Sequence, residues 1–363
     1  MKLLIRGSSV HSIFSIPSDE FCQRQTTLLA KVFGSDFVLV MRADIIATDT
    51  LLTWLSQTGP ALICAETGEA LLAFGPLSDE QALTQAFDAP NTAAMKSYTV
   101  GQNSFFARKL RRREPITVYD LRSEKTRKVE KAMFDLSYKG ITDCVTKYVF
   151  PLPTWHAVQL LSRLKITPNM VTIIGIILCV LAAVWFYQGL VLWALLAGWI
   201  MTFLDTVDGK LARVTATSSK IGNVLDHGTD LIHPPFWWVC IGMGILKYGP
   251  NVSVLHVLWA TIALVLTYFI GRFGEEFFKR SFGFNAYMWR PFDKYLRLFI
   301  ARRNTILVIL TLGFVTGFYA VSFYIAAAWS VLTISIQLAR LAFARHKAKD
   351  GETISIFLRQ EDT

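Results

Sequence analysis

Closely spaced cysteine pairs and a glycine-rich loop near the N-terminus are both missing from this sequence. Its five cysteines form no CxxC pair, which argues against a disulfide framework or a zinc ribbon and favours a reducing environment. The opening MKLLIRGSSVHSIFSI has no sustained apolar core and no small-residue cleavage site, so we expect no cleavable signal.

Acidic residues are scarce in the apolar half of the chain. Residues 151–349 contain seven Asp and Glu against 18 Lys and Arg, whereas the rest of the 363 residues contains 20 against 19. With 53% hydrophobic residues, the chain is too apolar for an ordinary soluble globule. Such a basic excess beside apolar runs is typical of a surface that faces lipid headgroups or an anionic substrate, and we expect no nucleic-acid binding.

Residues 1–100 alternate apolar strands with capped helices. The segments LLIR, FVLVMRAD, ALICAE and ALLAFG are predicted strands, and SDEFCQRQTTLLAKVFG, TDTLLTWLSQTG and SDEQALTQAFD are predicted helices. This order predicts an α/β domain with a partly parallel sheet. The order, with the strand that ends in VMRAD at Asp44, resembles a shortened sugar-nucleotidyltransferase domain. Because no glycine-rich loop is present to hold a nucleoside triphosphate, we expect a degenerate, regulatory or scaffolding domain, and an active transferase is the alternative.

Residues 101–166 are interpreted as a basic linker. Five Lys and Arg lie between positions 108 and 113, and SEKTRKVEKAMFDLSYKG follows. In that segment Val129, Met133 and Leu136 share one helical face, which predicts an interfacial helix on the cytoplasmic leaflet. A second such helix is predicted from Trp155 to Leu164. A solvated linker is the alternative interpretation.

Six apolar runs follow Thr167-Pro168, and each is close to the roughly 20 residues that a bilayer span requires. They cover about residues 169–187, 190–212, 221–246, 252–278, 304–319 and 321–344. The connections on one side carry almost no charge, and those on the other are rich in Lys and Arg, so both termini are predicted to be cytoplasmic. We therefore predict an α-helical protein of the inner (cytoplasmic) membrane, with six transmembrane helices in residues 167–346, a small N-terminal cytoplasmic α/β domain and a loosely ordered polar tail over residues 347–363.

Four aspartates lie where the second apolar run ends and the third begins: Asp205, Asp208, Asp226 and Asp230. Their spacings of three and four residues project each pair from one helical face. Carboxylates beside hydrocarbon are costly unless they are neutralised, which makes these aspartates candidate functional residues. Oxygen ligands without a His/Cys cluster suit Mg²⁺ or Mn²⁺. A structural ion-pair network or an ion pathway is the alternative.

Eight constrained positions are spread over this 26-residue stretch. They read Asp205-x2-Asp208-Gly209-x2-Ala212-Arg213-x8-Gly222-x3-Asp226-x3-Asp230. The pattern resembles the signature of the CDP-alcohol phosphotransferases at every fixed position. The segment ITPNMVT also resembles the start of the family's first span, so the likeness covers residues 150–346 approximately. Family proteins cleave the diphosphate of a CDP-linked alcohol and pass its phosphoryl-alcohol part to an acceptor hydroxyl, with release of CMP.

The resemblance implies a role for each of these residues. The four aspartates would hold two divalent ions, and Asp230 would also be the general base for the acceptor hydroxyl. Gly209 and Ala212 would leave room for a planar base, Arg213 would reach the diphosphate, and Gly222 would permit close helix packing. Three more residues match positions that line the CDP-donor site: Asn169, Thr172 and Ser219.

The substrates are less constrained. We expect CDP-diacylglycerol as donor, a polar alcohol as acceptor and a role in phospholipid biosynthesis, because the spans would keep acyl chains in the leaflet. A soluble donor such as CDP-inositol, transferred to an inositol phosphate or another polar acceptor, is the alternative enzyme. A non-catalytic membrane protein or cation carrier is the alternative of another class. The resemblance also implies a homodimer.

Several other side chains receive a structural interpretation. Trp237, Trp238 and Trp259 are predicted to face lipid or the membrane interface. Glu275 and Glu276 are predicted to pair with the basic residues that follow them. Eight basic residues on the cytoplasmic side could bind an anionic acceptor or reflect topology alone: Arg272, Lys279, Arg280, Arg290, Arg297, Arg302, Arg303 and Arg340.

Overall fold

The structure is a computed structural model. It describes residues 1–7, 11–33, 36–90, 95–102, 104–108, 110–249 and 251–357, and the side chains of residues 31–33, 220, 221, 223, 226 and 227 lie outside this description. The chain divides into two compact units. The N-terminal unit comprises Met1–Gly140, Trp155–Thr167 and Gly209–Ser218. The helical unit comprises Ile141–Thr154, Pro168–Asp208 and Ser219–Thr363.

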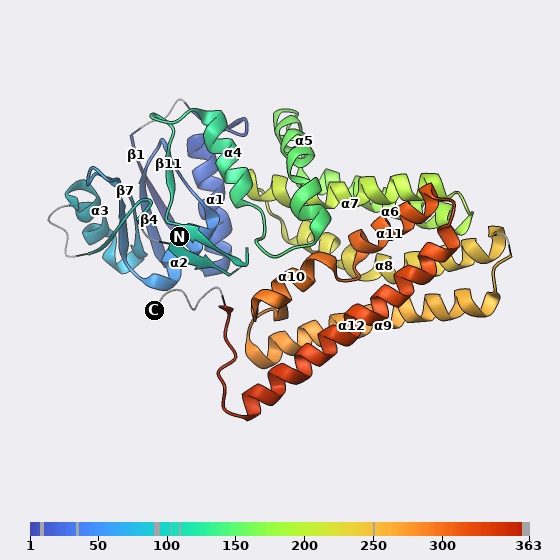
Figure 1. The fold of residues 1–363 in the computed structure, drawn as a ribbon. Helices are drawn as coiled ribbons and strands as arrows, with labels where there is room; N and C mark the ends of the chain where they lie inside the picture. The colour runs from blue at the N-terminus through green and yellow to red at the C-terminus, as the bar shows by residue number, and fades with distance from the viewer. Residues whose placement is uncertain are drawn as a thin grey trace. The chain divides into compact units, whose positions relative to one another are not determined.

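A five-stranded sheet forms the centre of the N-terminal unit (Figure 1). Its strands, in spatial order, are β1 (Lys2–Arg6), β4 (Phe37–Arg42), β7 (Ala70–Pro76), β6 (Ala61–Cys64) and β8 (Lys96–Thr99). The pairs β1/β4 and β6/β8 are parallel, and β7 is antiparallel to both of its neighbours. The predicted partly parallel sheet is therefore confirmed.

The apolar run FVLVMR explains why this sheet has helices on both faces. Val38 and Val40 of β4 pack with Leu83 and Phe87 of α3 (Glu80–Asp88). The alternate residues of β4 are buried too, and Figure 1 shows α1 (Ser18–Phe33) on the side of the sheet opposite α3. Strands buried on both faces are expected to be continuously apolar. The helix α2 (Asp49–Thr58) packs against α1, and the predicted helix end at Gly34 lies outside the described residues.

Residues 104–136, which were expected to be a linker with an interfacial helix, instead continue the N-terminal unit. The strands β9 (Ser104–Ala107) and β10 (Arg112–Pro115) form an antiparallel pair, and β11 (Val118–Asp120) pairs with β5 (Ile45–Ala47). A short hairpin, β2 (Ser12–Ile13) and β3 (Ile16–Pro17), completes the strands that the structure describes. On the apolar face of α4 (Thr126–Leu136), Val129 and Met133 are buried by protein and Leu136 is partly buried, so little of this face remains for lipid.

The second predicted interfacial helix coincides with α5 (Pro151–Arg163), which follows the short π-helical turn η3 (Val145–Val149). Its Trp155 and Val158 are buried, whereas Leu160 and the following Leu164 are exposed. This one-sided pattern agrees with an amphipathic helix, and its contact with a membrane surface stays a prediction.

Long helices make up most of the helical unit. They are α6 (Pro168–Tyr187), α7 (Val191–Val214), whose last turns belong to the N-terminal unit, α8 (Lys220–Tyr248), α9 (Val254–Phe282), η4 (Ala286–Met288), α10 (Pro291–Phe299), α11 (Arg303–Val315) and α12 (Tyr319–Lys349). Among the described residues four helices are long and apolar enough to span a membrane: α6, α7, α9 and α12. The pair α10–α11, bent by 43°, would be a fifth. The six predicted spans are thus not confirmed, because α11 has only 13 residues and α8 carries charges and two prolines.

One apolar core joins these helices. Its fully buried members include Ala182, Ala194, Trp237, Val257, Leu307 and Phe323, one from each of α6, α7, α8, α9, α11 and α12. The prediction that Trp237 and Trp238 face lipid is wrong, because their side chains are buried, with exposed fractions of 0% and 1%. Trp259, in contrast, is 60% exposed, as predicted. The Trp237 indole N–H donates to the Cys179 carbonyl at 3.0 Å, and its ring packs over Gly198, where an added Cβ would be 3.3 Å from it.

The C-terminal segment begins later than predicted. Helix α12 continues to Lys349, past the expected start of the tail at residue 347, and Ile356 is buried. Residues 350–353 are exposed, so only the end of the described tail is partly buried, and residues 358–363 lie outside the description.

Candidate active site

The ends of two consecutive helices carry the four signature aspartates. Asp205 and Asp208 lie on α7, and Asp226 and Asp230 lie on α8. Helix α8 starts at Ser219, whose Oγ accepts the Gly222 backbone N–H at 2.9 Å as an N-cap. The side chain of Asp226 lies outside the described residues.

A single arginine connects the first and last aspartates of the signature. Arg303, the first residue of α11, donates from Nη2 to Asp205 Oδ2 at 2.6 Å and from Nη1 to Asp230 Oδ1 at 2.9 Å. The guanidinium is nearly buried, whereas the Asp230 side chain is 41% exposed. Three helices thus bring two carboxylates to one cation. From the sequence, Arg303 was predicted only as one of eight basic residues that could bind the acceptor.

Asp208 is buried and has a partner on another helix. Thr172 of α6 donates from Oγ1 to Asp208 Oδ2 at 2.5 Å. Thr172 was predicted to line the donor site. In the structure its hydroxyl orients a signature carboxylate, which is how ligands of a metal site are commonly held in place.

Two of the predicted donor-site residues, Asn169 and Ser219, lie together with Gly222 where α6 meets the start of α8. Ser219 Oγ donates to Asn169 Oδ1 at 3.1 Å while it caps Gly222. A Cβ added to Gly222 would lie 2.4 Å from Asn169 Oδ1. The close approach predicted for Gly222 is therefore present, and only glycine permits it without a shift of Asn169.

The remaining signature residues are on the last turns of α7, which belong to the N-terminal unit. A Cβ added to Gly209 would lie 3.3 Å from Arg213 Nη2, so the Arg213 side chain folds back over Gly209. Ala212 precedes Arg213 and adds no bulk beyond its methyl group. The roles predicted for these three residues in donor binding stay predictions.

A buried polar group that the sequence analysis missed supports Arg303. Its neighbour Asn304 donates to Asp143 Oδ1 at 2.9 Å and accepts from Thr202 Oγ1 of α7 at 3.2 Å. Burial alone would raise the pKa of Asp143, but the Thr146 backbone N–H and the Asn304 amide hold it below its usual range. In the sequence, the sign of this buried polar group is Asn304, a polar residue that directly follows Arg302 and Arg303 at the start of an apolar run.

Most of the basic acceptor candidates already have acidic or backbone partners. Arg302 pairs with Glu275, and Arg280 pairs with Glu276 at 3.0 Å, so the prediction for Glu276 is confirmed and Glu275 has a different partner. Arg272 donates to the Asp230 carbonyl at 3.3 Å. Arg297 differs from these, because its Nε and Nη1 are buried without a hydrogen-bond partner among the described residues.

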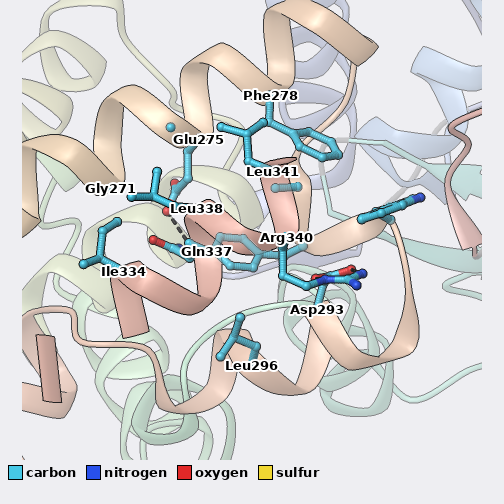
Figure 2. Close-up of a pocket in the computed structure, with 14 residues that line it drawn as sticks. Gly271, Glu275, Phe278, Asp293, Leu296, Ile334, Gln337, Leu338, Arg340 and Leu341 are labelled. Atoms are coloured by element: carbon cyan, nitrogen blue, oxygen red, sulfur yellow. Dashed lines mark hydrogen bonds and ion pairs between the residues drawn. The ribbon is translucent and has the colours of Figure 1, made fainter. Parts of the chain in front are cut away.

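A small pocket lies between α9, α10 and α12 (Figure 2). Figure 2 shows Asp293 and Arg340 facing each other on one side and Glu275 and Gln337 on the other. Arg340 donates twice to Asp293, both at 2.8 Å, and Tyr287 donates to Glu275 at 2.6 Å. The cavity of about 30 Å³ has room for one or two waters but not for a CDP-alcohol.

The residues present fit a divalent metal by their chemistry. Among the described side chains, which exclude that of Asp226, no three His, Cys, Asp or Glu groups converge as a metal site. Asp205 and Asp230 nevertheless share one positive charge between them, and Asp208 lies one helical turn from Asp205. Carboxylate oxygens of this kind are preferred by Mg²⁺ and Mn²⁺.

Comparisons with known proteins identify a family for part of the chain. Residues 165–336 match the family model described as CDP-alcohol phosphatidyltransferase. The archaetidylinositol phosphate synthase of Pyrococcus horikoshii is 44% identical over 71 residues, which are 19% of this chain and 37% of that protein. The phosphatidylinositol phosphate synthase of Cutibacterium acnes is 38% identical over 111 residues, 29% of this chain and 50% of that protein. Cholinephosphotransferase 1 of Danio rerio is 35% identical over 106 residues, which are 28% of this chain and 27% of that protein.

The chain therefore spans at most half the length of these three curated relatives. The crystal structure of Mycobacterium tuberculosis phosphatidylinositol phosphate synthase with CDP-DAG bound has a TM-score of 0.40 and 22% identity, and the match covers 52% of this chain and 92% of that one. A structure of the same protein in complex with manganese and citrate has a TM-score of 0.41, 22% identity and coverages of 52% and 88%. On the evidence of the family model and the relatives, residues 165–336 form a CDP-alcohol phosphatidyltransferase domain, from a family of transferases that act on phosphate-containing groups.

Proposed function

We propose that this chain is an integral-membrane enzyme that transfers a phosphatidyl group from CDP-diacylglycerol to the hydroxyl of a polar alcohol and releases CMP. The convergence of Asp205 and Asp230 on Arg303, within a domain of this family, is the observation that carries the proposal. A cation carrier would need the carboxylates but would not need the glycine, alanine and arginine between them.

Two Mg²⁺ or Mn²⁺ ions, held by Asp205, Asp208, Asp226 and Asp230, would neutralise charge on the diphosphate and on the leaving phosphate. The Thr172 hydroxyl keeps Asp208 in one orientation. The acceptor oxygen bonds to the phosphorus that carries the alcohol group of the donor, and the bond from that phosphorus to the CMP oxygen breaks. Arg303 binds Oδ1 of Asp230, which leaves the second oxygen of that carboxylate to take the acceptor's proton.

The outer face of α6 supports a lipid donor. Asn169 and Thr172 lie at the start of this helix, and exposed apolar side chains continue from there along one side at helical spacing: Met170, Ile173, Ile174, Ile177, Val180 and Val184. An acyl chain on this face would extend into the membrane while its diphosphate stays at the end of the helix that contacts Asp208. A donor such as CDP-inositol would make no use of this surface.

Buried Arg297 supports an acceptor alcohol that itself carries a phosphate or another negative charge. Its guanidinium lies over the Tyr287 ring at 5.5 Å, beside Arg302 at 5.9 Å from the same ring. Its Nε and Nη1 are buried without a partner among the described residues, which is costly unless an anion binds them. Because Arg302 and Arg303 are consecutive, this basic group lies next to the aspartates.

We further propose six transmembrane helices, α6 to α9, α11 and α12, with both termini and the site at the cytoplasmic face of the cell's inner membrane. The shared core of these six helices supports the number, since α8 and α11 contribute fully buried residues to it. Of the four candidate spans, α9 has the smallest share of its apolar segment buried inside the protein, 17% against 33–44% for the others. This leaves surface on α9 for lipid and for a second copy in a homodimer. The N-terminal unit is proposed to be a degenerate nucleotidyltransferase-like domain.

The test is release of radiolabelled CMP by the purified protein with Mg²⁺. The donor is either CDP-diacylglycerol or CDP-inositol, and the acceptors are a panel of polar alcohols with and without a phosphate. We expect release from CDP-diacylglycerol, fastest with a phosphorylated alcohol. Turnover of CDP-inositol alone would overturn the lipid donor, and no release under any condition would overturn the activity and favour a non-catalytic membrane protein.

A further inference from the structure

Lys210, inside the signature, has contacts that the signature chemistry does not explain. It is only 3% exposed, and its Nζ donates to the Ser137 carbonyl at 2.9 Å and lies 3.4 Å from the centre of the Tyr138 ring. Ser137 and Tyr138 directly follow α4, and all three residues belong to the N-terminal unit. The side chain therefore connects the last turns of α7 to the end of a helix more than 70 positions earlier in the chain.

The same end of α4 is held from the other side by the N-terminal strands. Arg112 of β10 donates to the carbonyls of Asp135 at 3.2 Å and Leu136 at 2.7 Å. Glu114, which is buried, accepts two hydrogen bonds from Arg112 at 3.0 Å, and Thr50 of α2 donates to the other Glu114 oxygen at 2.5 Å. The last carbonyls of a helix have no partner within it, so these donors satisfy groups that would otherwise be costly to bury.

The chain after α4 has little freedom to move. The Gly140 N–H donates to the Leu110 carbonyl at 2.7 Å, and a Cβ at Gly140 would lie 2.8 Å from the Arg111 carbonyl oxygen. The end of α4 is thus fixed to the β9–β10 pair before it contacts Lys210. A fixed carbonyl is a better anchor for a buried amino group than a mobile one, because less ordering entropy is lost when the bond forms.

We infer that Lys210 is a positioning residue through which the N-terminal unit holds the end of α7, together with Gly209, Ala212 and Arg213. The N-terminal unit then acts as a support for the donor-contacting part of the signature, which gives a degenerate domain a function without nucleotide chemistry. The expected effect of this support on donor binding rests on the proposed function, whereas the contact between Lys210 and the end of α4 does not. The alternative is a buried lysine that is satisfied locally and has no effect beyond its own turn.

Hydrogen–deuterium exchange of the full-length protein in detergent tests the connection without any substrate. Lys210→Met removes both contacts and keeps the unbranched stem, and Lys128→Met on α4, where the side chain is 76% exposed, is the control. We expect amides of residues 209–216 and of residues 133–138 to exchange about tenfold faster in Lys210→Met and to be unchanged in the control. Unchanged exchange in residues 133–138 would overturn the inference.

Steady-state kinetics test the consequence for the donor. We expect Lys210→Met to raise KM for the CDP-linked donor about tenfold with kcat within about threefold, because the variant loosens donor contacts and leaves the aspartates in place. Arg112→Met should shift KM in the same direction from outside the signature, and it replaces Lys210→Met if that variant does not fold. Lys210→Arg should restore part of the affinity, since a guanidinium can still donate to Ser137.

The two tests separate the two ideas. A lower kcat with unchanged KM in both Lys210→Met and Arg112→Met would overturn positioning of the donor site. Absence of CMP release by the wild-type protein would overturn the proposed function, whereas the exchange experiment would still decide whether the N-terminal unit holds α7.

Discussion

Arginines meet carboxylates in both units, and the two clusters differ in how these groups are paired. In the N-terminal unit Arg42 and Arg122 both contact the same three acids, Asp44, Glu69 and Asp120. In the helical unit Arg303 pairs with both Asp205 and Asp230, and the other two signature aspartates, Asp208 and Asp226, lie three and four residues away on the same helices.

The difference separates a structural network from a candidate reaction centre. Asp44 is nearly buried and contacts two guanidinium groups, so its oxygens are already occupied. The same applies to Asp120, which contacts both arginines. In the helical cluster Arg303 pairs with two of the four signature aspartates, and the proposed divalent ions would bind the same group of carboxylates. Identical residue types therefore support different functions because their pairing differs.

The sharpest way to break this comparison is to neutralise one aspartate in each cluster. We expect Asp230→Asn to lower the rate of CMP release about 10³-fold, because a general base is lost. Asp44→Asn should leave that rate within about twofold and lower only thermal stability. Equal losses of activity in the two variants would show that both clusters are catalytic, or that neither is.

Arg303→Gln removes the guanidinium that pairs with both Asp205 and Asp230. We expect CMP release to fall about 100-fold and the metal-free protein to melt at a lower temperature, since the paired carboxylates lose their neutralising charge. Mg²⁺ or Mn²⁺ should then raise Tm more in the variant than in the wild type, because the ion supplies the missing charge. Thermal unfolding followed with and without metal measures this, and an equal metal response in both proteins would contradict it.

Thr172→Val sharpens the description of the helical cluster. Loss of the hydroxyl that orients Asp208 should lower kcat about tenfold with little effect on folding. Thr261→Val, which removes a hydroxyl that donates to a carbonyl within α9, is the matched control and should be neutral. Equal kcat values for the two variants would show that Thr172 does not orient the carboxylate.

Gly222→Ala tests the contact between α6 and α8 beside the aspartates. The added Cβ would lie 2.4 Å from Asn169 Oδ1, and such overpacking typically costs about 1–3 kcal/mol. We expect Tm to fall by several degrees and to recover in part in the double variant Gly222→Ala/Asn169→Ala, which lacks the obstructing amide but keeps Ser219 Oγ 2.9 Å from the added Cβ. A double variant that melts as low as the single one would place the strain elsewhere.

The smallest expected effect concerns pH and the N-terminal network. Burial alone would raise the pKa of Asp120, but the backbone N–H and guanidinium of Arg122, together with Arg42, lower it to about 2. A folded pKa below the unfolded value of 3.8 means that the ionised group adds stability above pH 4, which is lost as pH falls towards 2.

Asp120→Asn should therefore reduce the fall in Tm of the N-terminal unit between pH 4 and pH 2. Asp88→Asn is the control, because Asp88 pairs with Arg6 at an exposed position and such pairs contribute little. Thermal unfolding of the three proteins across this range measures the effect. The same pH profile in Asp120→Asn and the wild type would contradict the assigned contribution.

Local patterns in the sequence predicted local structure well. Four features lie where the sequence predicted them, because each depends on residues that are neighbours in the chain. They are the strands LLIR and FVLVMR, the capped helix after Thr48 and the start of α6 at Pro168. The signature aspartates were placed on their helices for the same reason. Amphipathic spacing was less reliable, since α4 presents the same face to protein that it would present to lipid.

Pairings between distant residues could not be predicted. Arg303 reaches Asp205 across 98 positions, and a basic residue at the start of an apolar run satisfies the positive-inside rule equally well without any partner. Trp237 is in the core only because other helices surround it, although its neighbours in the sequence are typical of a membrane interface. Burial depends on packing, which single-segment patterns do not contain.

The sequence by itself therefore determined the family signature, the helices that carry it and the apolar character of the C-terminal half, because these follow from spacing along one chain segment. Only the tertiary structure decided that Arg303 lies between two of the aspartates, that Thr172 binds Asp208, and that Lys210 is fixed to the end of α4. Each of these contacts joins residues from different elements, and their geometry exists only after those elements have packed.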